Sequence, residues 1–328
     1  MKKVLTAVCA VLLAWNVFLT VRIHDISKNA VTSDTNQIEY EITNYTSDLS
    51  KMISSIRGSV VQVEDGAGCV FSCVDTVIHI LTSADVVQDA ETVSVTFDSG
   101  AVAEGKVLGK DDITGIAVVE IQSGFTASAL KHADSDEVME GEVVVAMGGR
   151  NGVTLETESS MGIIQSQSVN THTVQILKSD TSVQHCKGGP LVNVAGEIVG
   201  IITNEQQMYT ESIGINDAIA AYDEIVDAGN VTRGMLNIQY RDIDGLKPYQ
   251  KNEHNLSLDL SSGILVTGVF GNAKDILQVN DVITAINTIA VKDGKDLREI
   301  QYDLEPSQEC TLNILRDGKE LTVSVIAE

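Results

Sequence analysis

The amino-acid sequence predicts a mainly β protein with two globular domains behind an N-terminal transmembrane helix. Three observations support this fold class: a length of 328 residues with 43% hydrophobic content, an apolar N-terminal run, and a series of short Val- and Ile-rich segments. A chain of this size can bury two cores. Turn-forming residues separate the short segments, and their spacing favours a sandwich or barrel over a parallel α/β sheet. The segments are 59–63, 77–81, 93–97, 116–121, 143–147 and 198–202.

The N-terminus has the composition of a membrane anchor. Two lysines precede an uncharged stretch from Val4 to Val21, which Arg22 follows. This stretch has about the minimum length that spans a bilayer core, and the basic flank should stay cytoplasmic. We therefore expect a single-pass anchor over residues 1–23, with the bulk of the chain outside the cytoplasm. A cleavable signal peptide is the alternative, but bulky Trp15 and Phe18 stand where its cleavage site needs small residues.

Residues 24–56 are expected to form a helical or flexible stalk. Apolar residues recur there in alternating steps of four and three, which is a heptad pattern. The segment is also rich in Ser, Thr and Asn, which are weak helix formers, so a flexible tether is the alternative to a coiled coil. The stripe consists of Val31, Thr35, Ile38, Ile42, Tyr45, Leu49, Met52 and Ile56.

The net charge limits which classes of partner the chain can bind, and the cysteine spacing indicates whether it has metal sites or disulfides. The formal net charge of −24 is spread along the chain and would repel polyphosphate, so nucleic acid is not an expected partner. The cysteines show no metal-ligand spacing, and we expect no metal and no cofactor. Cys69 and Cys73 are too far apart for a disulfide if their strand is extended. Together with Cys186 and Cys310 they should be mostly free, buried thiols.

Between Gly58 and about Asp227, five segments follow one another in a recognisable order: Gly66–Phe71, Ile80–Val87, Asp111–Val119, residues 134–136 with 141–144, and Gly188–Asn193 with Gly196–Ile201. This ordered set resembles the HtrA/Deg family of trypsin-like serine proteases. The resemblance implies a trypsin-like double β-barrel over residues 57–229.

The three catalytic positions of the family hold other residues here. By the resemblance, Asp85 stands at the position of the general-base His, Gly115 at that of the orienting Asp, and Lys187 at that of the nucleophilic Ser. Acyl transfer by this fold needs a hydroxyl, an imidazole and a carboxylate in those roles. The loop before Gly188 is also one residue shorter than the family pattern, so we expect a distorted oxyanion hole. The sequence therefore predicts no catalytic residues, and a pseudoprotease that is not an enzyme.

An unconventional peptidase is the alternative function. His185 and Cys186 could form a thiol–imidazole pair, because an activated thiolate is a good nucleophile. Neighbouring residues in an extended segment point to opposite sides, which argues against this pair. We also expect Asp85 and Lys187 to form an ion pair in the cleft, the alternative being two unrelated surface residues.

The segment from residue 230 to 328 resembles the PDZ domain of HtrA-type proteins. The matching segments are Arg233–Ile238, Ser262–Val266, Val279–Asn287 and Leu312–Lys319. A PDZ domain adds an extended peptide to a sheet edge and receives its carboxylate on loop N–H groups. The resemblance gives Met235, Leu236, Asn237 and Ile238 to the carboxylate loop, and Leu297 and Ile300 or Gln301 to the opposite helix. Asn237 replaces a loop glycine, but Asn tolerates positive φ.

Together these expectations describe a noncatalytic HtrA-like envelope protein that binds or scaffolds polypeptides through its PDZ domain. The alternative is an HtrA-like endopeptidase homologue with residual or Cys/His activity in protein quality control. The expected partners are C-terminal or extended peptides and the membrane. A homotrimer or a mixed oligomer with an active relative is left open.

Overall fold

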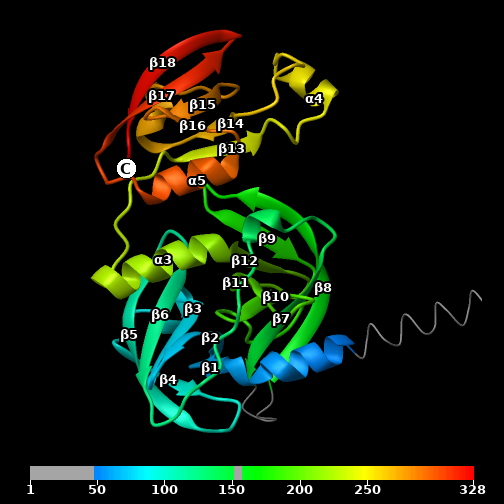
Figure 1. Ribbon diagram of the computed structural model, residues 1–328, viewed down its shortest axis with the longest axis vertical. Helices are drawn as coiled ribbons and strands as arrows, with labels where there is room; N and C mark the ends of the chain where they lie inside the picture. The colour runs from blue at the N-terminus through cyan, green and yellow to red at the C-terminus, as the bar shows by residue number, and fades with distance from the viewer. Residues whose placement is uncertain (1–47, 151–156) are drawn as a thin grey trace, which may run out of the picture. The chain divides into compact units, whose positions relative to one another are not determined.

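The computed structural model describes residues 48–150 and 157–328 (Figure 1). Within these ranges the strands form two closed six-stranded barrels, followed by one six-stranded sheet. The expected mainly β architecture, two barrels and then an α+β domain, is confirmed. Residues 55–328 form one compact unit.

The first barrel has the strand order β1-β2-β3-β6-β5-β4. Its interior is filled by alternating β-branched residues, among them Val61, Ile80 and Val119, each no more than 1% exposed. This is the placement that the pleat of a barrel strand requires. The strands are β1 (Val60–Val63), β2 (Gly66–Val74), β3 (Val77–Ser83), β4 (Thr92–Thr96), β5 (Val102–Asp111) and β6 (Ile116–Gln122).

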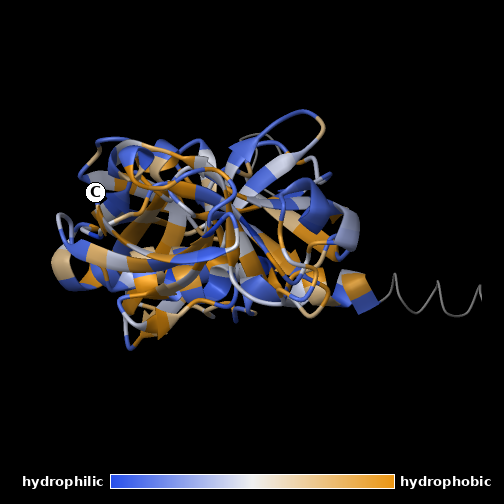
Figure 2. Ribbon diagram, turned by 90° about the horizontal axis from the view of Figure 1, so that it is seen from above, coloured by the Kyte–Doolittle hydropathy of each residue, from blue (hydrophilic) through white to orange (hydrophobic). Residues whose placement is uncertain are grey.

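The second barrel closes in the order β10-β11-β12-β9-β8-β7. Its core includes Val144, Leu177 and Leu191, all fully buried. Figure 2 shows apolar and polar residues interleaved along the ribbon, as expected for strands with one buried face. The strands are β7 (Val143–Arg150), β8 (Thr157–Val169), β9 (Gln175–Ser179), β10 (Pro190–Asn193), β11 (Ile198–Glu205) and β12 (Thr210–Gly214).

Helices connect and flank these barrels. The longest of them is α3 (Ile215–Ala228), which ends where Gly229 adopts a left-handed conformation with φ of 78°. The four-residue helix α2 (Ala84–Val87) directly follows β3. Short 3-10 turns occupy η1 (Arg57–Ser59) and η2 (Ser135–Glu137).

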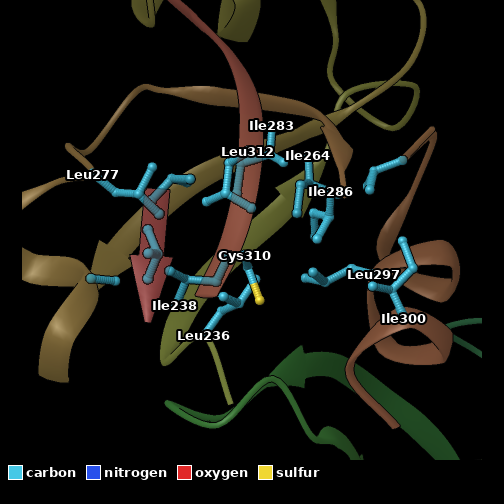
Figure 3. Packing of buried hydrophobic residues seen from close by; sticks show 14 of the residues in the cluster. Leu236, Ile238, Ile264, Leu277, Ile283, Ile286, Leu297, Ile300, Cys310 and Leu312 are labelled. Carbon is cyan, nitrogen blue, oxygen red and sulfur yellow. The ribbon is translucent and has the colours of Figure 1, made fainter. Parts of the chain in front are cut away.

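The C-terminal domain is a sheet in the order β13-β14-β15-β17-β18, with β16 paired to β15. Helix α5 packs its apolar face on this sheet, and Figure 3 shows Leu297 and Ile300 of α5 directed toward Leu236 and Ile286. The elements are β13 (Ile238–Asp242), α4 (Pro248–Glu253), β14 (Ile264–Val269), η3 (Gly271–Asp275), β15 (Val282–Ile286), β16 (Ile289–Ala290), α5 (Gly294–Tyr302), β17 (Glu309–Arg316) and β18 (Lys319–Ile326).

The N-terminal expectations fall mostly outside the described residues. The anchor at 1–23, Cys9 and most of the stalk lie in residues 1–47, and only residues 48–56 of the stalk are described, as helix. Within the described part of the chain, no helix is long and apolar enough to cross a membrane. The four described cysteines are free thiols, and all but the partly exposed Cys73 are buried, as expected.

Candidate functional site

An open cleft of about 760 Å³ lies between residues of the two barrels. The first barrel contributes Glu64, Asp65 and the α2 region, and the second contributes His185, Lys187 and the end of β11. Carboxylates outnumber cationic side chains in the lining, so the cleft has a negative potential.

Of the three replaced positions, Asp85 and Lys187 line this cleft, and Gly115 lies next to the start of α2. Asp85 lies in the first turn of α2, and the preceding Ala84 N–H donates to the carbonyl oxygen of Gly115 at 2.7 Å. Gly115 has a φ of 71°, which glycine adopts without strain. The carboxylate of Asp111 fixes this turn by accepting the Ile113 N–H at 3.0 Å.

The expected ion pair between Asp85 and Lys187 is present. The Lys187 Nζ donates to Asp85 Oδ2 at 2.8 Å, although the positions are 102 residues apart in the chain. The side chains are 33% exposed at Lys187 and 70% exposed at Asp85. A pair this open to solvent contributes at most about 1 kcal/mol, so its effect is to orient both groups rather than to stabilise the fold.

In the shortened loop before Gly188, two backbone N–H groups still point toward a common acceptor. His185 takes the left-handed conformation with φ of 54°, in place of a glycine. The N–H groups of Cys186 and Lys187 then donate to the same oxygen, Oε2 of Glu205, at 2.8 and 3.1 Å. The sequence reasoning missed Glu205, which stands at the end of a strand with no motif around it.

The structure does not bring the His185 imidazole onto the Cys186 thiol. His185 Nδ1 lies 3.1 Å from the carbonyl oxygen of Asp65. Burial, and then the negative charge of Glu205, raise the pKa of the buried Cys186 thiol far above its usual range. A thiolate is therefore disfavoured at this position. His79, on β3, contacts the Tyr222 hydroxyl at 2.7 Å. No group of metal-binding side chains occurs among the described residues.

In the C-terminal domain, the predicted carboxylate loop Met235–Ile238 is buried and bonded internally. The Leu236 N–H donates to Gln301 Oε1 on α5 at 3.1 Å. Asn237 has a φ of 52°, as its replacement of a glycine predicts, and its amide donates to Glu328 Oε2 at 2.6 Å.

The predicted helix residues lie in two places. Leu297 belongs to the domain core, whereas Ile300 is also part of the lining of a neighbouring cavity of about 370 Å³. A larger cavity of about 540 Å³ lies between the two domains. Tyr240, Arg241 and Asp242 of β13 and the start of α5 line one side, and residues of η2, β8 and β9 of the second barrel line the other. Burial raises the pKa of the Asp242 carboxyl to about 6, and the Gly294 N–H partly offsets this.

The other face of α5 contacts the second barrel through buried polar groups. Asp217 of α3 is only 2% exposed; it accepts a short hydrogen bond from the Tyr302 hydroxyl and one at 2.7 Å from the Gln175 N–H. Burial raises the pKa of Asp217 to about 6, against the lowering effect of these donors. Arg298 pairs with Asp136 on the barrel side. The sequence does contain a signal for the contact between Asp217 and Tyr302, because Asp217 is a single acidic residue on the apolar face of a helical segment.

Comparisons with known proteins agree with the two domains. A profile for the trypsin-like peptidase domain matches residues 66–201, and a PDZ domain profile matches residues 234–326. The chain is 30% identical to the serine protease Do-like HtrB of Bacillus subtilis (strain 168) over 79% of this chain and 61% of that protein. It is also 30% identical to the periplasmic serine endoprotease DegP of Escherichia coli (strain K12), over 75% of this chain and 54% of DegP. The chain thus spans little more than half the length of these two relatives.

Solved structures show the same fold. The HtrA-type protease AlgW with a tripeptide matches 85% of this chain and 96% of its own, with a TM-score of 0.62 and 23% identity.

The relatives contradict the expectation that the chain is not an enzyme. Proteins that match three quarters or more of it are named serine proteases or endoproteases, which points to an enzyme. The expectation rested on Asp85, Gly115 and Lys187 and on the shortened loop before Gly188, and these positions do not define what the other groups of a 760 Å³ cleft do. With both domain profiles matched in order, the chain has a trypsin-like peptidase domain followed by one PDZ domain, and it is similar to serine proteases of the HtrA/Deg family.

Proposed function

We propose that this protein is an HtrA-type polypeptide-binding protein whose PDZ domain captures extended or C-terminal peptide segments at the edge of β13. The observation that carries the proposal is the cavity of about 540 Å³ along β13 and the start of α5, which η2, β8 and β9 of the second barrel line on the opposite side. Strand β13 ends the sheet order, so one side of it is available for an added strand. AlgW, which shares the fold, has been solved with peptides.

The charge around the groove favours a polypeptide over a small apolar ligand. Arg241 lines this cavity beside the carboxylates of Asp242 and Asp293, whereas Lys295 and Arg298 already pair with Asp134 and Asp136 of the barrel side. Side chains of both signs can pair with a peptide of mixed charge, while the strand edge supplies sequence-independent hydrogen bonds.

A C-terminal carboxylate would have to replace the Gln301 amide oxygen. That oxygen now accepts the Leu236 N–H, at a position that the resemblance assigns to the carboxylate loop. A carboxylate is the stronger acceptor, because hydrogen bonds to an ionised group are shorter and roughly twice as strong as neutral ones. Free C-termini should therefore bind better than amidated ones.

Titration of the full-length chain with a peptide library tests the proposal. We expect saturable binding of a subset of peptides, with affinity lost on C-terminal amidation. Gln301→Ala should strengthen binding, whereas Gln278→Ala, on the exposed surface, should leave it unchanged. If no peptide binds the folded chain, the PDZ proposal fails.

The proposed organisation and location follow from the N-terminal composition. We assign residues 1–23 to a membrane anchor, 24–56 to a stalk, 57–229 to the peptidase-type domain and 230–328 to the PDZ domain, with the bulk outside the cytoplasm. Assembly as a homotrimer, or with an active relative, belongs to the same proposal. Membrane fractionation with protease protection tests the location, and light scattering of the purified chain tests the assembly.

Peptide hydrolysis is the second candidate, favoured by the names of the relatives. The groups nearest the family's nucleophile position are Lys187, held by Asp85, and the buried Cys186. Incubation of the full-length chain with an unfolded protein substrate tests this candidate. Cleavage abolished by Lys187→Ala or by Cys186→Ala would assign that residue to the reaction. Cleavage that survives both changes would place the reactive group elsewhere, and no cleavage would argue against hydrolysis.

A further inference from the structure

Two successive backbone N–H groups in the barrel cleft converge on one oxygen atom. The donors are Cys186 and Lys187, and the acceptor is Oε2 of Glu205, at 2.8 and 3.1 Å. Positive φ angles on either side, 54° at His185 and 87° at Gly188, turn the two N–H groups to the same side of the loop. Consecutive N–H groups arranged in this way form a concave anion-binding site.

The fold delivers Glu205 to these donors by a local irregularity. The pairing of β11 with β12 shifts register between Ile202 and Asn204, and Glu205 is the last residue of β11. Such a bulge redirects the side chains that follow it. Glu205 therefore enters the lining of the cleft from the second barrel, across from the α2 residues.

The N–H groups of Cys186 and Lys187 favour a carboxylate as their acceptor. Among the residues that line the cleft, Lys187 directs its ammonium to Asp85 at 2.8 Å, whereas the Glu205 carboxylate accepts from the two N–H groups and also interacts with the Cys186 thiol. Hydrogen bonds from N–H groups to an ionised oxygen are stronger than those to a neutral acceptor. The backbone pair thus already binds a carboxylate, supplied by the chain itself.

We propose that the N–H groups of Cys186 and Lys187 form a carboxylate-binding site whose resident occupant is Glu205, and that a carboxylate from solution binds there by replacing it. This inference goes beyond the PDZ function and does not depend on it, because the site lies in the barrel cleft. Asp65 and Asp85 line the same cleft, so a second anion is repelled while Glu205 remains. Exchange, not addition, is the expected mode, and the surrounding cleft leaves room for a peptide end.

The backbone amide NMR signals of Cys186 and Lys187 in the full-length chain report directly on this site. Acetate is the probe, and Glu205→Ala removes the resident carboxylate. We expect acetate to shift both signals saturably in Glu205→Ala, with an apparent affinity roughly tenfold to a hundredfold stronger than in the wild type. Glu205→Gln, which keeps a neutral acceptor oxygen, should lie between the two. Asp65→Asn is the control in the same cleft: it removes one repelling charge but keeps the resident Glu205, so it should strengthen acetate binding far less than Glu205→Ala does.

Several outcomes would overturn the inference. It fails if acetate shifts the two signals equally in the wild type and in Glu205→Ala, or if it shifts them in neither folded protein. If Glu205→Ala does not fold, Glu205→Gln and the wild type decide the matter by the same comparison. Peptides with a free C-terminus and amidated peptides that contain Asp then separate a terminal from a side-chain carboxylate. Binding at the PDZ groove leaves these two signals unchanged, so the proposed function and this site can fail separately.

Discussion

Replacement of the buried Asp217 by Asn should remove part of the pH dependence of stability. Burial raises the folded-state pKa of this carboxyl to about 6, from 3.8 for the unperturbed group. A raised pKa means that the folded state favours the protonated form. The stabilisation is therefore fully present below pH 3.8 and is lost as the pH rises through about 6. Between pH 7.5 and 5.0 this one carboxyl adds roughly 1.4 kcal/mol to the unfolding free energy of the wild type.

Urea unfolding of the wild type and of Asp217→Asn at both pH values measures this contribution of Asp217 to the unfolding free energy. Asp242, whose pKa is also about 6, titrates in both proteins and cancels from the comparison. The difference in unfolding free energy between wild type and variant should change by roughly 1.4 kcal/mol from pH 7.5 to 5.0. An Asp217→Asn difference that is the same at both pH values would refute the reasoning.

Two further changes test packing near the sites. Asp281→Asn should cost about 3 kcal/mol of unfolding free energy, because the 1% exposed carboxylate accepts two bonds from Arg316 at 2.7 and 2.6 Å; an unchanged urea midpoint would contradict this. Gly188→Ala should cost about 2–5 kcal/mol, since its Cβ would lie 2.2 Å from the Ala67 carbonyl oxygen at a φ of 87°. Gly100→Ala, at a φ of 84° with open space, should cost only about 1–2 kcal/mol, and equal losses would refute the steric argument.

The hydrophobic pattern predicted the strands of both barrels well. In each strand the residues either alternate between apolar and polar or are apolar throughout. The segments around Ile116 and Ile198 appear as β6 and β11, each extended by one to three residues. Helix α3 begins at Ile215 although Asn216 and Asp217 have low helical propensity, because tertiary contacts hold both residues in its first turn.

The sequence predicted only those features of the site that follow from the type of residue at a position, such as its charge or its tolerance of positive φ. Opposite charges at Asp85 and Lys187 predicted their pairing, and Asn at position 237 predicted positive φ. Glu205 and Asp217 were missed because their partners, loop N–H groups and a tyrosine in the other domain, are distant in sequence. The enzymatic class was predicted wrongly, because replaced side chains describe three positions and not the whole cleft.

The central claim is that β13 receives polypeptide at its free edge, and amide hydrogen exchange on the full-length chain tests it most directly. With a peptide that binds in the titration, the account predicts slower exchange within Ile238–Asp242 and in α5, while the barrel strands exchange as before. Slower exchange confined to the barrels, with β13 unaffected at saturating peptide, would contradict the account.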